Sequence, residues 1–303
     1  MLRFGLLMLT AVALCAAPKG EPVHVRVPVW SNAPALAGVK VRVAGAESRV
    51  VDVRGPADDL IVLLVMDVVG DLASIEPAKD ALVAEIAKLP EKAWVGLLRA
   101  QDGLRVIVDP TPDREKAIQA IRDLPTTGTA GLLENVELMG RIADSILSKT
   151  SVRVAVLYIT DSTVSNYRED FTNPVINSSD SGDLSRRFPE RLIQEKISKV
   201  ENVLAGQQAP LFIVHLDYRN DRMNEAYQIG LKRLAEITGG SAAFCRSRGE
   251  IPSAIQSTLG SITSHYSVTL ILPEDSPQKV DLQLTAEGQQ ALNYRSRLTV
   301  KGR

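Results

Sequence analysis

Hydrophobic residues near both ends of the chain alternate with polar ones. The alternation occupies residues 23–29, 39–43, 50–54, 267–272, 280–284 and 295–300. A period of two with many valines is typical of strands that bury one face in an antiparallel sheet. Both ends are therefore predicted to be β-rich.

Between these ends the pattern changes to continuous apolar runs separated by helical spacing. Residues 60–66, 152–160 and 211–216 are apolar on both faces, which is typical of central strands of a parallel sheet covered by helices. Residues 94–98 and 104–108 flank Asp102-Gly103, a pair that predicts a tight hairpin and one antiparallel edge strand. Helices are predicted at 75–89, 113–123, 130–149, 188–205, 224–238 and 250–263, and a short strand at 241–245. Alternating strands and helices predict an α/β fold with a doubly wound, mostly parallel, Rossmann-like sheet.

The two β-rich ends are predicted to pack together. Strands 21–56 and 266–303 would otherwise leave unpaired edges, which favour aggregation. The economical arrangement is one small β-sandwich built from both ends, with the α/β domain of residues 58–265 inserted between its halves.

The first 17 residues resemble a leader. Arg3 is followed by an apolar run over 4–17, shorter than the roughly 20 residues of a membrane-spanning helix. A charged start and a short apolar core predict a secretory signal peptide, so the protein is expected in the periplasm or outside the cell. Pro18 is unfavourable just after a cleavage site, and the alternative is a retained leader that anchors the chain in the membrane. Leu14 before Cys15 argues against lipid attachment.

Composition narrows the partners. The formal net charge is -1 and no dense basic cluster exists, so nucleic acid is not expected as a ligand. If Cys15 leaves with the leader, Cys245 is a single thiol and no internal disulfide can form. The fold then depends on packing, for which the 45% of hydrophobic residues suffice.

Asp67 and Asp161 each follow a strongly apolar predicted strand. Ligands of doubly wound sheets bind at these carboxyl ends, so the two carboxylates are expected in a shared crevice. The alternative is that each caps the helix after it, because Asp is a favoured N-cap. The hydroxyl-rich loop 126–131 lacks the Lys of a phosphate-binding loop. Its Thr oxygens together with carboxylates suit a hard cation such as magnesium, and the alternative is that they cap the helix at 130–149.

These pieces resemble a von Willebrand factor type A domain. That family has an apolar strand ending in Asp-x-Ser-x-Ser, a Thr in a Gly-Thr loop and a later strand ending in Thr-Asp-Gly, which together form a metal-ion-dependent adhesion site. The matching segments here are 63–71, 127–130 and 158–162, and the resemblance extends over about residues 58–265. With the leader and the flanking strands, the chain is similar to secreted bacterial proteins of a related type.

The motif is degenerate. Val69 stands where the family has its first Ser, and Asp71 where it has the second. Valine has no lone pair, and an extra carboxylate would neutralise a cation internally and weaken its attraction for an acidic partner residue. The resemblance therefore implies weak or altered binding of Mg²⁺ or Mn²⁺ at Asp67, Asp71, Thr129 and Asp161. A metal-free crevice is the alternative.

The favoured function is a non-enzymatic interaction module that binds another protein in the envelope or outside the cell. His24, His215 and His265 have no metal-ligand spacing, and no Gly-x-Ser-x-Gly elbow is present. The alternative is a metal-dependent hydrolase that uses the strand-end carboxylates. The polar loop 162–190 leaves the same strand end as Asp161 and is predicted to contact the partner, with simple disorder as the alternative.

Overall fold

The computed structural model describes residues 23–32, 35–167, 189–289 and 291–300. The predicted leader and residues 168–188 of the predicted loop 162–190 lie outside these ranges. None of the described helices is long and apolar enough to cross a membrane.

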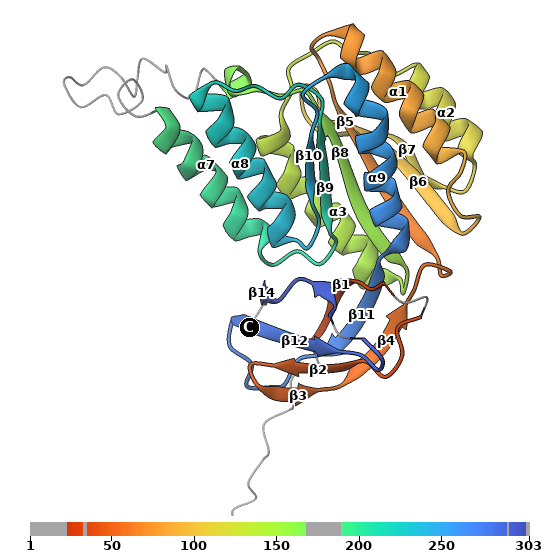
Figure 1. Ribbon diagram of the computed structural model, residues 1–303, viewed down its shortest axis with the longest axis vertical. Helices are drawn as coiled ribbons and strands as arrows, with labels where there is room; N and C mark the ends of the chain where they lie inside the picture. Colours follow the sequence, from red (N-terminus) through yellow and green to blue (C-terminus); the bar gives the residue numbers. More distant parts are fainter. Residues whose placement is uncertain (1–22, 33–34, 168–188, 290, 301–303) are drawn as a thin grey trace, which may run out of the picture.

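A six-stranded sheet forms the centre of the molecule, in the order β10-β9-β8-β5-β6-β7 (Figure 1). Its strands are β5 (Leu60–Asp67), β6 (Ala93–Arg99), β7 (Arg105–Thr111), β8 (Arg153–Thr160), β9 (Leu211–His215) and β10 (Ala242–Phe244). All neighbours pair in parallel except β6 and β7, which are antiparallel. The hairpin loop between them, residues 100–104, turns through Asp102 and Gly103, whose φ values of 54° and 97° are left-handed. The predicted fold class and its antiparallel edge strand are confirmed.

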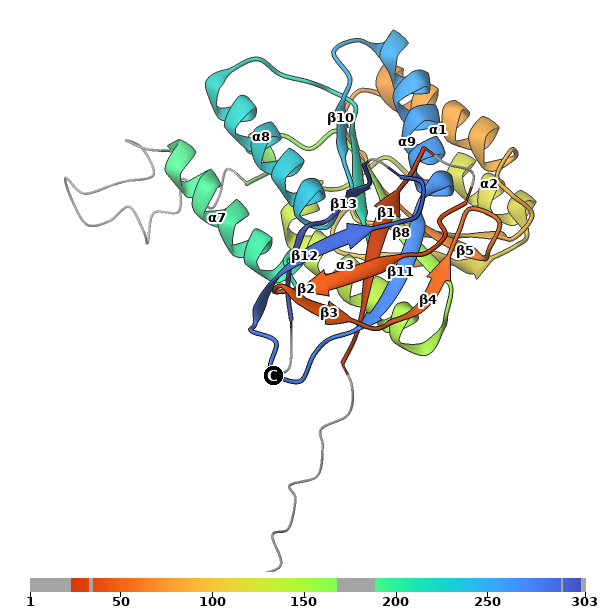
Figure 2. The same cartoon turned by 60° about the horizontal axis from the view of Figure 1, so that its bottom comes forward.

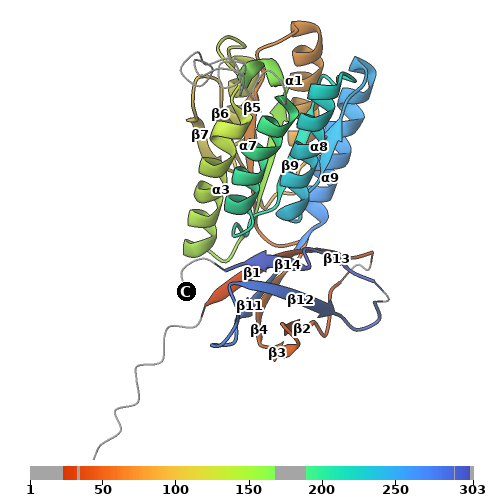
Figure 3. The same ribbon diagram turned by 90° about the vertical axis from the view of Figure 1, so that its left-hand side faces the viewer.

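Helices cover both faces of this sheet (Figure 3). One face carries α1 (Leu72–Ile86), α2 (Arg114–Arg122) and α9 (Ile251–Ser264), and the other carries α3 (Leu132–Lys149), α7 (Pro189–Leu204) and α8 (Arg222–Ile237). Two short 3-10 helices, η1 (Val164–Tyr167) and η3 (Arg248–Glu250), lie in the connections. Because β5 alternates its side chains, Leu64 joins one core and Leu63 the other.

Two four-stranded antiparallel sheets lie at one end of the α/β domain, the end that Figure 2 brings forward. One has the order β13-β1-β11-β4 and the other β14-β12-β2-β3. The strands are β1 (His24–Trp30), β2 (Lys40–Val43), β3 (Ala46–Ser48), β4 (Val50–Arg54), β11 (Tyr266–Ile271), β12 (Lys279–Thr285), β13 (Asn293–Tyr294) and β14 (Arg297–Thr299). Strands from both ends of the chain pair directly, for example β1 with β11. A valine- and leucine-rich core joins the two sheets into the predicted sandwich.

The buried Arg153 forms hydrogen bonds with both chain segments that connect the sandwich to the α/β domain. Its guanidinium donates to the carbonyls of Pro56 and Asp58 on the way out of the sandwich, at 3.1 and 3.0 Å. It also donates to the carbonyls of Thr263 and His265 on the way back, both at 2.9 Å. The side chain is fully buried at the start of β8, and burial lowers its pKa to about 10.

Candidate functional site

Asp67, the last residue of β5, is fully buried at the carboxyl edge of the sheet. One carboxylate oxygen accepts the N–H of Gly131 at 3.0 Å, and the other accepts the hydroxyl of Thr160 at 3.2 Å. Burial raises the pKa of Asp67 to about 7, although these two hydrogen bonds act in the opposite direction.

Asp161 lies beside Asp67, because β5 and β8 are neighbours and end together. Its backbone N–H donates to the carbonyl of Asp67 at 3.4 Å. Its carboxylate accepts the N–H of Val69 at 3.0 Å and that of Gly70 at 2.5 Å. A Cβ at Gly70 would lie 2.5 Å from the Asp161 carboxylate, so only glycine allows this approach. Burial raises the pKa of Asp161, and the two N–H bonds work against that rise.

The two aspartates therefore lie at adjacent strand ends. Neither caps the helix that follows it in sequence, because Asp67 binds the loop before α3 and Asp161 binds the loop before α1. The N-cap of α1 is Asp71, which accepts the N–H of Ala73 at 2.9 Å.

Asp71 also forms an exposed ion pair with Arg248 of η3, at 2.5 Å. The N–H of Ala73, and after it Arg248, lower the pKa of Asp71. Thr129 is exposed, and its backbone pairs with Asp102. The N–H of Thr129 donates to the Asp102 carboxylate at 2.9 Å, and the carbonyl of Thr129 accepts the backbone N–H of Asp102 at 3.0 Å. The loop thus reaches Asp67 through the N–H of Gly131, two residues beyond the predicted ligand.

The groups around Asp67 and Asp161, as they are arranged here, do not fit the coordination of a divalent cation. Magnesium takes six oxygen ligands in near-octahedral geometry. Here the carboxylates of Asp67 and Asp161 face N–H and O–H donors, and Val69 contributes an N–H where a ligand hydroxyl would be needed. Among the described residues, no group of three or more His, Cys, Asp or Glu side chains is placed to hold a metal ion. Weak binding by Asp67, Asp71, Thr129 and Asp161 stays a prediction, and it requires Asp161 to release the loop before α1.

An open crevice of about 350 Å³ lies over this edge of the sheet. It is lined by Gly70, Asp71, Ser74, Asp161, Leu216, Asp217, Arg219, Cys245, Arg246, Ser247 and Arg248. These residues come from the segments that follow β5, β8, β9 and β10, which all end on the same side of the sheet (Figure 1). Of the predicted site residues, Asp71 and Asp161 line this crevice, whereas Asp67 and Thr129 do not. Its rim carries charges of both signs.

Three arginines of the rim were not predicted. Arg219 pairs with Asp217 at 2.9 Å and Arg248 with Asp71, whereas the guanidinium of Arg246 lies over the ring of Tyr218, 5.1 Å from its centroid. The available signal was their position, because they follow the predicted strands 211–216 and 241–245 and so had to reach the same edge as Asp67 and Asp161.

The other polar groups beneath the crevice face inward. The His215 ring contacts the carbonyl of Ser162 at 2.7 Å, and the Ser162 hydroxyl is 2.7 Å from that of Tyr227. All three residues are buried, and burial lowers the pKa of His215. Cys245 lines the crevice, but burial raises the pKa of its thiol to about 11, so it is not an activated nucleophile.

Comparisons with known proteins concern the fold. No family model matches this chain, and no curated protein matches its sequence. Among solved structures, a von Willebrand factor type A protein from Catenulispora acidiphila is 13% identical, with a TM-score of 0.46, over 92% of this chain and 73% of the other. The von Willebrand domain of the type V pili tip protein Mfa5 from Porphyromonas gingivalis is 12% identical, with a TM-score of 0.45, over 68% of this chain and 95% of that domain.

A third solved structure, the conserved hypothetical protein BatB from Bacteroides thetaiotaomicron, is 14% identical, with a TM-score of 0.41, over 67% of this chain and 98% of the other. The strand order of the central sheet, its antiparallel edge strand and the meeting of the segments after β5 and β8 agree with the resemblance drawn from the motifs. The α/β domain of this chain therefore has the mostly parallel sheet with one antiparallel edge strand that its resemblance to a von Willebrand factor type A domain implies.

Proposed function

We propose that this chain is a non-catalytic interaction module whose protein partner docks over the crevice at the carboxyl edge of the central sheet. The observation that carries the proposal is the crevice itself, in which segments from four strands present an open, charged rim. Beside it, the first residue of α1, Leu72, is 57% exposed. An exposed apolar side chain next to a polar rim is typical of a protein-binding surface.

The chemistry of the crevice supports binding over catalysis. A nucleophilic mechanism needs an activated hydroxyl or thiol with a general base beside it. The thiol of Cys245 has a raised pKa, and the hydroxyl of Ser162 is buried against Tyr227. The ring of His215 is buried against a backbone carbonyl.

The leader predicted at residues 1–17 places the encounter in the periplasm or outside the cell. The partner is then an envelope or extracellular protein. Arginine and aspartate side chains on the rim can engage such a partner without a bound metal ion.

Site-specific photo-crosslinking tests the proposal. A photoreactive residue in place of Leu72 is expected to capture one defined protein from envelope extract. The same residue in place of Val51, which is 47% exposed on the sandwich, is expected not to capture it. Ser74→Trp, which fills the crevice, is expected to abolish capture at position 72. Identical products from both positions, or capture that Ser74→Trp leaves unchanged, would contradict docking at the crevice.

A further inference from the structure

Among the described arginines that line the crevice, Arg246 has a guanidinium that forms no ion pair, although its backbone N–H donates to the Glu250 carboxylate at 2.8 Å. Arg219 and Arg248 each contact a carboxylate within the chain, at Asp217 and Asp71. Within the part of the chain that the structure describes, the guanidinium of Arg246 has an aromatic ring beneath it and no carboxylate within ion-pair distance. Its side chain is exposed and lines the cavity.

We propose that Arg246, resting on Tyr218, receives the carboxylate of an Asp or Glu side chain of the partner directly, with no metal ion between them. This inference rests on the proposed function, because it names the chemistry by which the partner is recognised. A guanidinium offers a planar fork of N–H donors that matches a carboxylate in two parallel hydrogen bonds.

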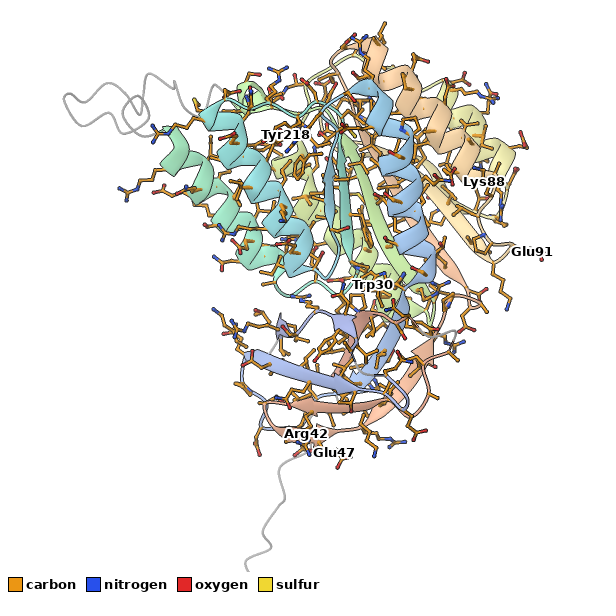
Figure 4. All side chains as sticks on the ribbon, in the orientation of Figure 1. Trp30, Arg42, Glu47, Lys88, Glu91 and Tyr218 are labelled. Carbon is orange, nitrogen blue, oxygen red and sulfur yellow. The ribbon has the colours of Figure 1, made fainter. Side chains whose placement is uncertain are left out.

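The Tyr218 ring beneath Arg246 is held in place by hydrogen bonds and by packing. The N–H of Cys245 donates to the carbonyl of His215 at 2.8 Å, and the N–H of Tyr218 donates to the carbonyl of Cys245 at 2.9 Å. The Tyr218 ring packs edge-on against Phe244, with centroids 6.4 Å apart. Figure 4 shows Tyr218 at the end of the sheet remote from the sandwich. A guanidinium stacked on a held ring loses less conformational entropy when it binds an anion than a free side chain would.

The charges around Arg246 leave its guanidinium available to a carboxylate from the partner. Asp71 and Asp217 are paired with Arg248 and Arg219, and the Asp161 carboxylate accepts two backbone N–H groups, so Arg246 is the cation that an incoming anion meets. A cavity of about 350 Å³ accommodates an acidic side chain with its neighbours, and the exposed Leu72 can contact an apolar residue next to it.

Selection from a library of short random peptides, displayed one per particle and panned against the full chain, tests this. The wild-type protein is expected to enrich peptides with Asp or Glu beside an apolar residue, equally with magnesium or with EDTA. For an enriched peptide, Arg246→Gln is expected to weaken binding about ten-fold or more, the loss of a charge-assisted hydrogen-bonded pair. Arg42→Gln, at an exposed arginine of the sandwich at the far end of the molecule (Figure 4), should leave binding unchanged.

Two substitutions of Tyr218 test the role of its ring. Tyr218→Phe keeps the aromatic face and should bind the peptide like the wild type, whereas Tyr218→Leu removes it and should bind about three-fold more weakly.

Several results would overturn the inference. These are a selection that lacks acidic residues, a selection that fails, equal binding by Arg246→Gln and wild type, or binding that depends on magnesium. If Arg246→Gln has no effect while Ser74→Trp still blocks partner capture at position 72, this inference fails and the proposed function stands. If capture at position 72 also fails, both fail.

Discussion

At the scale of single residues, the decisive contacts are those that Asp161 makes with the loop before α1. Its carboxylate accepts the N–H groups of Val69 and Gly70, which point toward it from the loop before α1. A partly buried backbone N–H such as that of Val69 needs an acceptor, and this internal carboxylate satisfies it together with that of Gly70. The sequence shows an aspartate at this strand end. It does not show which N–H groups the carboxylate binds, because a strand end can bind any loop that the fold brings to it.

Asp67 gives the protein a pH-dependent stability. Its carboxyl has a pKa of about 7 in the folded protein against 3.8 in the unfolded chain, so the folded state holds the proton more tightly between those values. The contribution is complete below about pH 4 and is lost as the pH rises through 7. The Asp67→Asn variant should therefore match the wild type near pH 4 and be more stable at pH 8, by no more than about 4 kcal/mol.

Urea denaturation of both proteins across pH 4 to 8 measures this difference. Burial lowers the pKa of His265 to about 4 and also lowers that of His215, so both histidines favour the folded state as the pH rises. Both are present in each protein, and the difference between the two curves isolates Asp67. A pH-independent difference would contradict the raised pKa.

Metal binding is predicted to be weak because Asp161 must first release Val69 and Gly70. Magnesium or manganese at millimolar concentration should raise the Tm of the wild type little. The double variant Val69→Ser, Asp71→Ser supplies two hydroxyl ligands and frees Arg248, and its Tm should rise further, by the mass-action stabilisation of a bound ion. Differential scanning fluorimetry with EDTA as the control compares the two. An equal rise in both proteins would mean that Val69 and Asp71 do not limit metal binding.

At the scale of elements, long segments with a strong period were predictable and very short ones were not. The predicted helix 130–149 is observed as α3 (Leu132–Lys149), and the predicted strand 152–160 as β8 (Arg153–Thr160). β3 (Ala46–Ser48) and β13 (Asn293–Tyr294) were not predicted, because two or three residues carry no period. Their strand geometry comes from the neighbouring strands with which they pair.

A lysine from another helix binds the carbonyl groups at the C-terminal end of α2. The ammonium of Lys79 in α1 donates to the carbonyl of Leu124 at 2.9 Å and to that of Arg122 at 3.3 Å. Its side chain is only 8% exposed. Lys79→Met keeps the apolar stem but removes both hydrogen bonds from the end of α2, and should lower the free energy of unfolding by about 1–3 kcal/mol.

Lys88→Met is the matched control for that experiment. Its ammonium pairs with Glu85 on the surface and its side chain is 62% exposed, so the change should stay within about 0.5 kcal/mol. Urea denaturation measures both variants. Equal losses in the two would show that Lys79 contributes no more than a surface charge.

At the scale of the whole molecule, Arg153 couples the sandwich to the α/β domain. It donates to carbonyls on both connections between them, so neither connection can move without breaking hydrogen bonds. The indole N–H of Trp30, which lies at the same junction (Figure 4), donates to the carbonyl of Ser261 in α9 at 2.9 Å. These contacts predict that the two parts unfold together.

Arg153→Met should separate their unfolding. It leaves four carbonyls without their donor, which should cost about 3 kcal/mol or more, and calorimetry should show two transitions where the wild type shows one. Arg297→Met alters an arginine that is 75% exposed and should keep a single transition. A single transition in the Arg153 variant, at the wild-type temperature, would contradict the coupling.

The sequence by itself determined the α/β domain, the β-rich ends and the two aspartates at strand ends, because periodicity and strand ends are local properties of the chain. Only the tertiary structure decided that Asp161 binds Val69 and Gly70, that Gly131 rather than Thr129 reaches Asp67, and that Arg246 lies on Tyr218. Those contacts join residues that are between about thirty and ninety positions apart in the sequence. Arg246 and Tyr218 are brought together because they follow β10 and β9, which are neighbours in the sheet. Which side chain meets which in such a crevice depends on strand order and loop path, and neither is written in any local pattern.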